Sequence, residues 1–372
     1  MFAVRCCAAI MVLLIGACSG ADSVDTPDTT EAALSPAPTS RATTTTDADD
    51  VTAVMFDGRD LTLAGDLRLP DGRGPHPGIV LLGGSGPSSR DGVVPGQLAM
   101  TFPQPVTVLA DLAAALRDAG YAVLTYDKRT CGPFNGCADN GYPTPPDDLT
   151  IEAFVDDATA AVTYLRSRSD VRTDGVVFAG HSQGASFVPG MLLDDPKLAA
   201  GVMLSAPYEP VDVLLAAQAE TVARIVAGLD TPPPAAAASV TQLRQLARSV
   251  SNLRSGGGGA DDTTQLGGAS VGFWRSWLRQ SDGVPQLAQQ ATQPVLVLNG
   301  GADTNVDSDQ TARWRQTLTD DPDRVVELDC VSHALNCLGT DDPLAVDPGA
   351  IETTVDARVA QTIADFLDPV LR

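Results

Sequence analysis

A serine between two glycines stands at residues 180–184, where the sequence reads Gly-His-Ser-Gln-Gly. A serine hydroxyl attacks at neutral pH only when a nearby base takes its proton, and that base is usually a histidine held by a carboxylate. The short apolar run before it, residues 175–179, predicts a buried strand, and residues 185–188 can begin a helix. Strand, sharp turn and helix with Gly-x-Ser-x-Gly at the turn form a nucleophile elbow, so Ser182 is the predicted nucleophile.

The chain has three histidines, and their positions indicate which one is the base. His76 lies in a turn rich in proline and glycine, far along the chain from the elbow. His181 flanks Ser182, and its side chain is expected to point away from the serine hydroxyl. Catalytic groups that use this elbow follow the order serine, acid, histidine along the chain. His333 is the histidine downstream of Ser182, and elimination predicts it as the general base.

The acid is expected directly after a strand late in the chain. Residues 294–299 form a continuous apolar run that ends at two glycines, and Asp303 follows them. In a chain with 47 acidic residues, position after a strand is more informative than residue type, and it favours Asp303. Three alternatives remain: Asp307 as the next choice, then Glu209 and Asp212 after the preceding strand.

An oxyanion hole needs two backbone N–H groups aimed at the charge that develops during the reaction. One should belong to Gln183, the residue after the nucleophile. The other should come from the glycine-rich loop at 83–87, which follows an apolar strand at 79–82, with Ser85 or Gly86 as the donor. The loop lacks the Gly-Lys-Ser/Thr ending of a phosphate loop and the spacing of a dinucleotide loop, so we do not expect it to bind a nucleotide.

Taken in order, these motifs resemble those of the bacterial α/β-hydrolases related to dienelactone hydrolases and serine aminopeptidase-type esterases. The matching blocks are 84–87 with Arg90 and Asp91, 120–121, 126–129, 180–184, 273–278, 294–303 with Val306, and His333. The resemblance spans roughly residues 51–370, and it implies ester hydrolysis by Ser182, Asp303 and His333. Two features depart from it: Gly83 stands where relatives usually carry histidine, and cysteines flank His333 on both sides.

Strands and helices alternate between these motifs, which predicts an α/β fold. Further strands are expected near 51–57, 61–69, 200–205 and 324–328, and helices near 106–119, 151–168 and 351–367. We therefore predict an α/β-hydrolase fold with a doubly wound, mostly parallel sheet. Residues 208–290 should be an insertion between strands that forms a helical cap over the site. Its aromatic residues should line the site or form the core of the cap: Phe273, Trp274 and Trp277.

The charge of the chain excludes one class of partner. Its 372 residues carry a formal net charge of −23, which would repel the phosphates of a nucleic acid. We expect a small-molecule ester as substrate, and neither a cofactor nor a metal.

The N-terminal residues predict export. Residues 1–17 contain Arg5 and a short apolar run, as in a signal peptide, and are too short to span a membrane. Cys18 ends a lipobox-like sequence and is the predicted lipidation site, which would anchor the protein to the cell membrane on its extracytoplasmic face. An ordinary cleaved signal peptide is the alternative. Residues 18–50, rich in Thr, Pro, Ser and acidic residues, predict a disordered linker to the hydrolase domain at 51–372.

Four cysteines remain once the signal peptide and Cys18 are set aside: Cys131, Cys137, Cys330 and Cys337. An even number in an exported protein favours disulfides. Three connectivities are possible, and proximity favours the local pairs 131–137 and 330–337. Their spacing is not that of a zinc site.

Two classes of function follow from the sequence. The first is a serine esterase that forms an acyl-enzyme at Ser182, with an aminopeptidase, amidase or acyltransferase on the same triad as the alternative. The second is a non-catalytic lipoprotein that keeps the scaffold for binding at the cell surface. The intact set of triad candidates favours the esterase.

Overall fold

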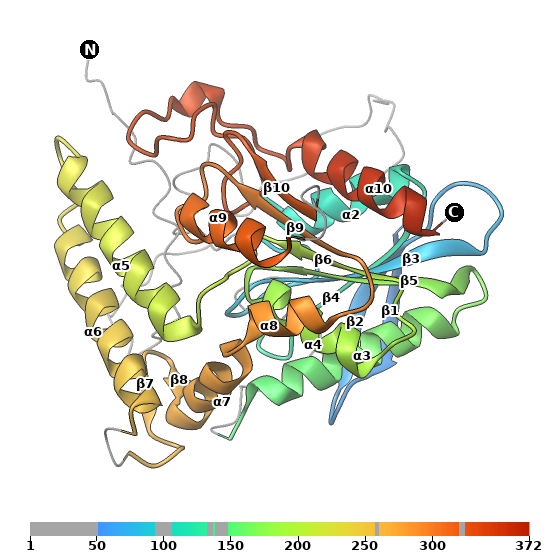
Figure 1. Ribbon diagram of the computed structural model, residues 1–372, viewed down its shortest axis with the longest axis horizontal. Helices are drawn as coiled ribbons and strands as arrows, with labels where there is room; N and C mark the ends of the chain where they lie inside the picture. Colours follow the sequence, from blue (N-terminus) through green and yellow to red (C-terminus); the bar gives the residue numbers. More distant parts are fainter. Residues whose placement is uncertain are drawn as a thin grey trace, which may run out of the picture.

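An eight-stranded, mostly parallel sheet forms the centre of the molecule (Figure 1). The computed structural model describes residues 51–93, 106–131, 137, 148–256, 260–319 and 324–371. The strands lie in the order β1-β2-β4-β3-β5-β6-β9-β10. Their bounds are β1 Val51–Asp57, β2 Thr62–Arg68, β3 His76–Leu82, β4 Ala122–Tyr126, β5 Val171–His181, β6 Ala200–Leu204, β9 Val295–Gly300 and β10 Val325–Leu328. Strands β1 and β2 are antiparallel, as are β2 and β4, and every other pairing in the sheet is parallel.

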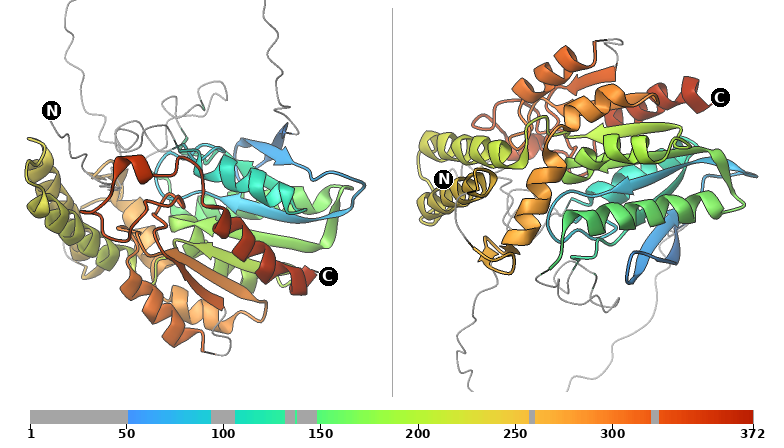
Figure 2. Two further views of the ribbon diagram at one scale, coloured as in Figure 1. Left: turned by 90° about the horizontal axis from the view of Figure 1, so that it is seen from above. Right: turned by 60° about the horizontal axis from the view of Figure 1, so that its bottom comes forward.

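Helices cover both faces of this sheet, as Figures 1 and 2 show. Helices α2 (Val108–Asp118) and α10 (Ala357–Leu371) lie on one face, and α3 (Ile151–Ser167), α4 (Val188–Asp194) and α8 (Val284–Gln290) lie on the other. Side chains of β5 alternate between the two cores: Val177 and Ala179 face α2 and α10, whereas Val176 and Phe178 face α3. This two-residue period is that of a strand buried on both faces. The predicted doubly wound sheet is confirmed.

Between β6 and β9 the chain leaves the sheet and forms an insertion, residues 205–294. It contains α5 (Val211–Gly228), α6 (Ala236–Arg254), the short hairpin of β7 (Gln265–Leu266) and β8 (Ala269–Ser270), α7 (Val271–Ser281), and α8. Helices α5 and α6 pack side by side at the edge of the molecule (Figure 1), and a small apolar cluster that includes Val222 and Leu243 joins them. Trp274 of α7 is fully buried, stacks on Trp277 and donates its indole N–H to the Leu266 oxygen at 2.8 Å. Both tryptophans belong to the main apolar core, which also includes residues of α3 and β5.

The last helix begins later than the sequence suggests. The prediction placed it at 351–367, whereas α10 begins at Ala357, and Pro348–Ala350 form a separate 3-10 turn. The physical reason is the Asp356 carboxylate, which accepts the backbone N–H of Arg358 at 2.8 Å and so caps the first turn. Strand β4 is absent from the predicted strands, although all five of its residues are buried. None of the helices in the described ranges combines the length and the apolar character that crossing a membrane requires.

The predicted signal peptide at 1–17, the linker at 18–50 and Cys18 lie outside the residues that the structure describes.

Candidate active site

Ser182 occupies a sharp turn between β5 and the 3-10 helix η3 (Ser182–Phe187), and its φ of 55° is in the left-handed region. Such a backbone is strained for a residue with a side chain and is typical of functional turns. The turn requires the glycines on either side. A Cβ at Gly180 would collide with the Gly184 carbonyl, and a Cβ at Gly184 would lie 2.8 Å from the Leu82 oxygen. The motif therefore has the geometry of a nucleophile elbow.

The structure brings Ser182, His333 and Asp303 into one hydrogen-bonded chain. The Nε2 of His333 lies 3.0 Å from the Ser182 Oγ, and its Nδ1 lies 2.8 Å from the Asp303 Oδ2. All three side chains are buried. One tautomer satisfies both contacts: the Nδ1–H donates to the carboxylate, and Nε2 accepts from the serine hydroxyl.

Asp303 follows β9 and is held as a carboxylate. Its Oδ1 accepts the backbone N–H groups of Asn305 at 2.8 Å and Val306 at 2.9 Å, which leaves Oδ2 for His333. Burial alone would raise the pKa of Asp303, but the charge and hydrogen bond of His333, together with the two N–H groups, lower it below its ordinary value. The Asp303 carboxylate is thus ionised wherever the histidine functions as a base.

The alternative acids have other partners. Asp307 caps helix α9 (Ser308–Thr317) by accepting the Gln310 N–H at 3.3 Å. Asp212 binds Arg254 at 2.8 Å, and Glu209 pairs with Arg313. Asp303 is the carboxylate that the structure places against His333.

The glycine-rich loop after β3 lies against the elbow. A Cβ on Gly84 would be 3.1 Å from the Ser182 Cβ, so that part of the loop backbone packs directly on the candidate nucleophile. Gln183, Ser85 and Ser182 line one pocket. Gly86, the other predicted donor, has a φ of 80° and is not among the residues that line this pocket; its carbonyl accepts the Thr130 hydroxyl at 3.1 Å.

That pocket lies between the elbow and the insertion. Its remaining lining residues come from the elbow helix and the insertion: Ser186, Pro207, Glu209, Val211, Leu214, Leu215, Gln218, Trp277, Ser281 and Val284. The wall contributed by α5, α7 and α8 is largely apolar, with Leu214, Leu215 and Trp277 facing the space next to Ser182. Such a space suits an apolar substituent of a substrate whose reacting carbon is at the serine.

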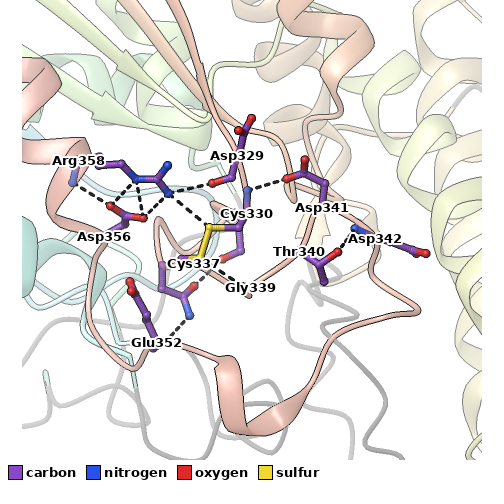
Figure 3. Close-up of a disulfide and its surroundings, with 12 residues drawn as sticks. Asp329, Cys330, Cys337, Gly339, Thr340, Asp341, Asp342, Glu352, Asp356 and Arg358 are labelled. Carbon is purple, nitrogen blue, oxygen red and sulfur yellow. Dashed lines mark hydrogen bonds and ion pairs between the residues drawn. A yellow bond between two sulfur atoms is a disulfide. The ribbon is translucent and has the colours of Figure 1, made fainter.

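A disulfide closes the loop that carries His333 (Figure 3). Cys330 and Cys337 are joined, with Cα atoms 4.8 Å apart, and their bond spans the six residues between them. Arg358 anchors the outside of this loop: it donates to the Asp329 carbonyl at 2.9 Å and pairs with Asp356 at 2.6 Å (Figure 3). The second local pair, Cys131 and Cys137, is also joined.

Two groups of side chains in the described ranges have the composition of a metal site. They are Asp127 with Cys131 and Cys137, and Asp356 with Cys330 and Cys337. In both groups the two sulfurs are joined in a disulfide, whereas a cysteine binds a metal as a free thiolate. Neither group therefore offers thiolate ligands.

Two residues next to Ser182 and His333 were not predicted from the sequence. The His181 Nε2 lies 2.7 Å from the His333 carbonyl oxygen, and the centroids of the two imidazole rings are 4.9 Å apart. Lys128 is buried beside Gln183. The available signals were that His181 lies inside the elbow motif and that Lys128 follows β4. Neither residue type by itself predicts such a contact.

Known proteins resemble this chain in both sequence and fold. The model of the family described as serine aminopeptidase, S33 matches residues 105–336, which is more than half of the chain. Esterase EstD of Thermotoga maritima is 28% identical over 275 residues; the match covers 73% of this chain and 58% of that protein, so the chain spans less than two thirds of the relative's length.

Solved structures extend the likeness in fold. Est1E from Butyrivibrio proteoclasticus has a TM-score of 0.50 at 15% identity, covering 86% of this chain and 98% of that one. The Pyrococcus furiosus esterase Pf2001 has a TM-score of 0.48 at 16% identity, covering 87% of this chain and 92% of that one. With the elbow after β5 and the mostly parallel sheet, the architecture is the α/β-hydrolase fold. The chain belongs to the serine aminopeptidase, S33 family.

Proposed function

We propose that this protein is a serine esterase that cleaves carboxylic esters through an acyl-enzyme on Ser182. The observation that carries the proposal is the chain of hydrogen bonds from Asp303 through His333 to the Ser182 hydroxyl, at 2.8 Å and 3.0 Å. Two groups within hydrogen-bond reach of the histidine, one on each ring nitrogen, are what activation of a serine requires. The esterase among the relatives in sequence supports the same reaction class.

In the first half of the reaction, the Ser182 oxygen attacks the ester carbonyl while its proton passes to the His333 Nε2. Asp303 stabilises the imidazolium that forms, and its hydrogen bond keeps Nε2 directed at the serine. The charge on the former carbonyl oxygen is received by the backbone N–H groups of Gln183 and of Ser85 or Gly86. Of these last two, Ser85 lines the pocket with Ser182, which favours it as the donor. The tetrahedral intermediate then collapses, the proton on Nε2 moves to the leaving alkoxide, and the alcohol departs.

The second half repeats these steps with water. His333 takes a proton from water as the water oxygen adds to the acyl carbon, and returns it to the Ser182 oxygen as the acid leaves. Ester and water are converted to acid and alcohol, and the enzyme returns to its starting state.

The lining of the pocket favours ester substrates that carry an apolar group of modest size. Leu214, Leu215 and Trp277 would contact that group, and we propose that the insertion functions as a cap that excludes water from it. Recognition of a peptide amine would need a free carboxylate in the pocket. Glu209 is the carboxylate among the lining residues, and Arg313 already pairs with it. Esters are therefore favoured over aminoacyl substrates.

We also propose that the enzyme is exported and anchored by a lipid on Cys18. The two disulfides in the folded domain support export, because such bonds persist in oxidising compartments. The lipobox-like sequence before Cys18 supports the anchor.

A substrate panel tests the proposed reaction. The purified domain is assayed with p-nitrophenyl esters of graded acyl length and with matched aminoacyl p-nitroanilides. Hydrolysis of short and medium esters, with at least about 100-fold lower kcat/KM for the anilides, is expected, since Glu209, the carboxylate among the described lining residues, is paired with Arg313. Preference for the anilides would contradict the proposal.

A further inference from the structure

Lys128 is a buried lysine that has no obvious place in the triad. It follows β4, only 2% of its surface is exposed, and its ammonium lies 4.7 Å from the centre of the Phe154 ring. An amine in such a place is costly to bury unless its hydrogen bonds are satisfied. The chain has one other lysine, Lys197, which is exposed.

The Nζ of Lys128 donates to two oxygens, and both belong to segments at the candidate oxyanion hole. It lies 2.7 Å from the Gly84 carbonyl oxygen in the loop after β3, and 2.9 Å from the Gln183 Oε1 in the elbow. Burial lowers the pKa of Lys128 to about 7, but a neutral amine still has two N–H groups. Both hydrogen bonds therefore persist in either protonation state.

The hydrogen bond from Lys128 to the Gly84 carbonyl also determines the direction of the Ser85 backbone N–H. The Gly84–Ser85 peptide is planar and trans, so its N–H, which belongs to Ser85, points opposite to its C=O. Holding the Gly84 carbonyl toward Lys128 therefore directs the Ser85 N–H to the side away from Lys128. No acceptor within the described ranges takes that N–H. Ser85 is the favoured oxyanion donor of the loop.

We infer that Lys128 is a positioning residue for the oxyanion hole: it fixes the Gly84–Ser85 peptide against the elbow and ties Gln183 to the same point. The inference rests on the proposed esterase mechanism. It adds the group that holds the two oxyanion donors, the backbone N–H groups of Ser85 and Gln183, in position relative to each other. Because a donor helps only when it meets the oxyanion of the transition state, the lysine should matter for kcat more than for substrate binding.

The residues around Lys128 support the same loop. The Lys128 N–H donates to the Ser88 oxygen at 3.0 Å, and the Thr130 hydroxyl donates to the Gly86 oxygen. The Asp127 carboxylate accepts the Arg90 N–H at 2.7 Å. The segment 127–130 thus contacts the loop at 84–90 at four points, of which the Lys128 amine is the one nearest the elbow. Its neighbours can keep the loop folded when that amine is removed.

The test compares Lys128→Met with Lys197→Met, the same change at an exposed lysine. A fluorophosphonate titration run to completion counts the reactive sites in each preparation, so that kcat refers to intact sites alone. The second readout is the inhibition constant of a trifluoromethyl ketone, whose adduct with the serine places a negative oxygen in the oxyanion hole. In Lys128→Met, kcat per titrated site should fall about 10- to 100-fold while KM changes less than about threefold, and the inhibition constant should rise by a similar factor. Lys197→Met should match the wild type.

Gln183→Met provides a second variant in case Lys128→Met does not fold. It removes one of the two oxygens that Lys128 binds and leaves the Gln183 backbone N–H in place. Its kcat should fall about tenfold. In the double variant with Lys128→Met, the fold-loss of kcat should be smaller than the product of the two single fold-losses. Wild-type kcat and inhibition constants per titrated site in both variants would overturn the inference, as would a lower kcat without weaker inhibition. Failure of the fluorophosphonate to label wild-type Ser182 would instead overturn the proposed function.

Discussion

The His181 Nε2 hydrogen-bonds to the main-chain oxygen of His333 at 2.7 Å, so the residue before the candidate nucleophile holds the backbone of the candidate base. Burial, together with the charge of nearby His333, lowers the pKa of His181 to about 3. At neutral pH the ring is therefore uncharged, and Nε2 carries the hydrogen that it donates to the carbonyl. The end of β5 and the loop that carries His333 are therefore joined by a hydrogen bond that the buried, neutral His181 ring donates.

Acidification should therefore destabilise the protein through His181. Its pKa is about 3 in the folded state and 6.5 for an unperturbed histidine, so between these values the unfolded state binds the extra proton. Stability contributed by His181 is complete above pH 6.5 and falls as the pH is lowered through this window. Between pH 7 and pH 5 the loss should be about 2 kcal/mol. Urea unfolding at both pH values measures it, and His181→Gln, which cannot titrate, should show a smaller difference. An equal difference in this variant would contradict the assignment.

Replacing Asp303 tests the acid of the triad. Asp303→Asn should reduce kcat about 10²- to 10⁴-fold, because it removes the charge that stabilises the imidazolium and favours the wrong tautomer of His333. Asp307→Asn is the matched control: Asp307 also follows β9 but caps α9, so the variant should lose about 1 kcal/mol of stability at most and little activity. Steady-state kinetics on both proteins decides, and a larger loss of kcat in Asp307→Asn would show that the acid has been misplaced.

Much of this fold can be predicted from sequence because its local signals are strong. The apolar runs that became β5 and β9 end in glycines, and such runs can be recognised without knowledge of their neighbours. The start of α10 was misplaced because the capping role of Asp356 depends on the chain around it. In the site, position after a strand singled out Asp303, the carboxylate that the structure places against His333. The contacts of His181 and Lys128 could not be found, because they join segments about 150 and 55 residues apart that only the sheet brings together.

The Cys330–Cys337 disulfide should contribute to activity as well as to stability. Changing both cysteines to serine opens a loop of six residues, for which the chain-entropy model gives about 2–3 kcal/mol. In addition, kcat should fall about tenfold, because His333 must stay within hydrogen-bond reach of Ser182. Changing Cys131 and Cys137 to serine opens a loop of similar length and is the control, with a similar change in Tm and a smaller change in kcat. Equal losses of kcat in the two double variants would contradict a local role for the first bond.

Lipidation at Cys18 makes a separate prediction about location. Cys18→Ser should move the protein from the membrane fraction to the soluble fraction, because that cysteine carries the proposed anchor. Stable attachment by a lipid needs more than one acyl chain, so mass spectrometry of the wild-type N-terminal peptide should show multiple acylation. A Cys18→Ser protein that stays in the membrane fraction would argue for a different anchor.

Covalent labelling at Ser182 tests the central claim most directly. A fluorophosphonate reacts with a serine only when a neighbouring base activates it, and the 3.0 Å contact with the His333 Nε2 predicts that Ser182 is activated. Peptide mapping of the labelled wild type should place the adduct on Ser182. Ser182→Ala should keep its fold by circular dichroism, lose the label, and lose ester hydrolysis down to the residual rate that binding and the oxyanion hole provide. A Ser182→Ala protein that still takes the label and hydrolyses esters would contradict the account.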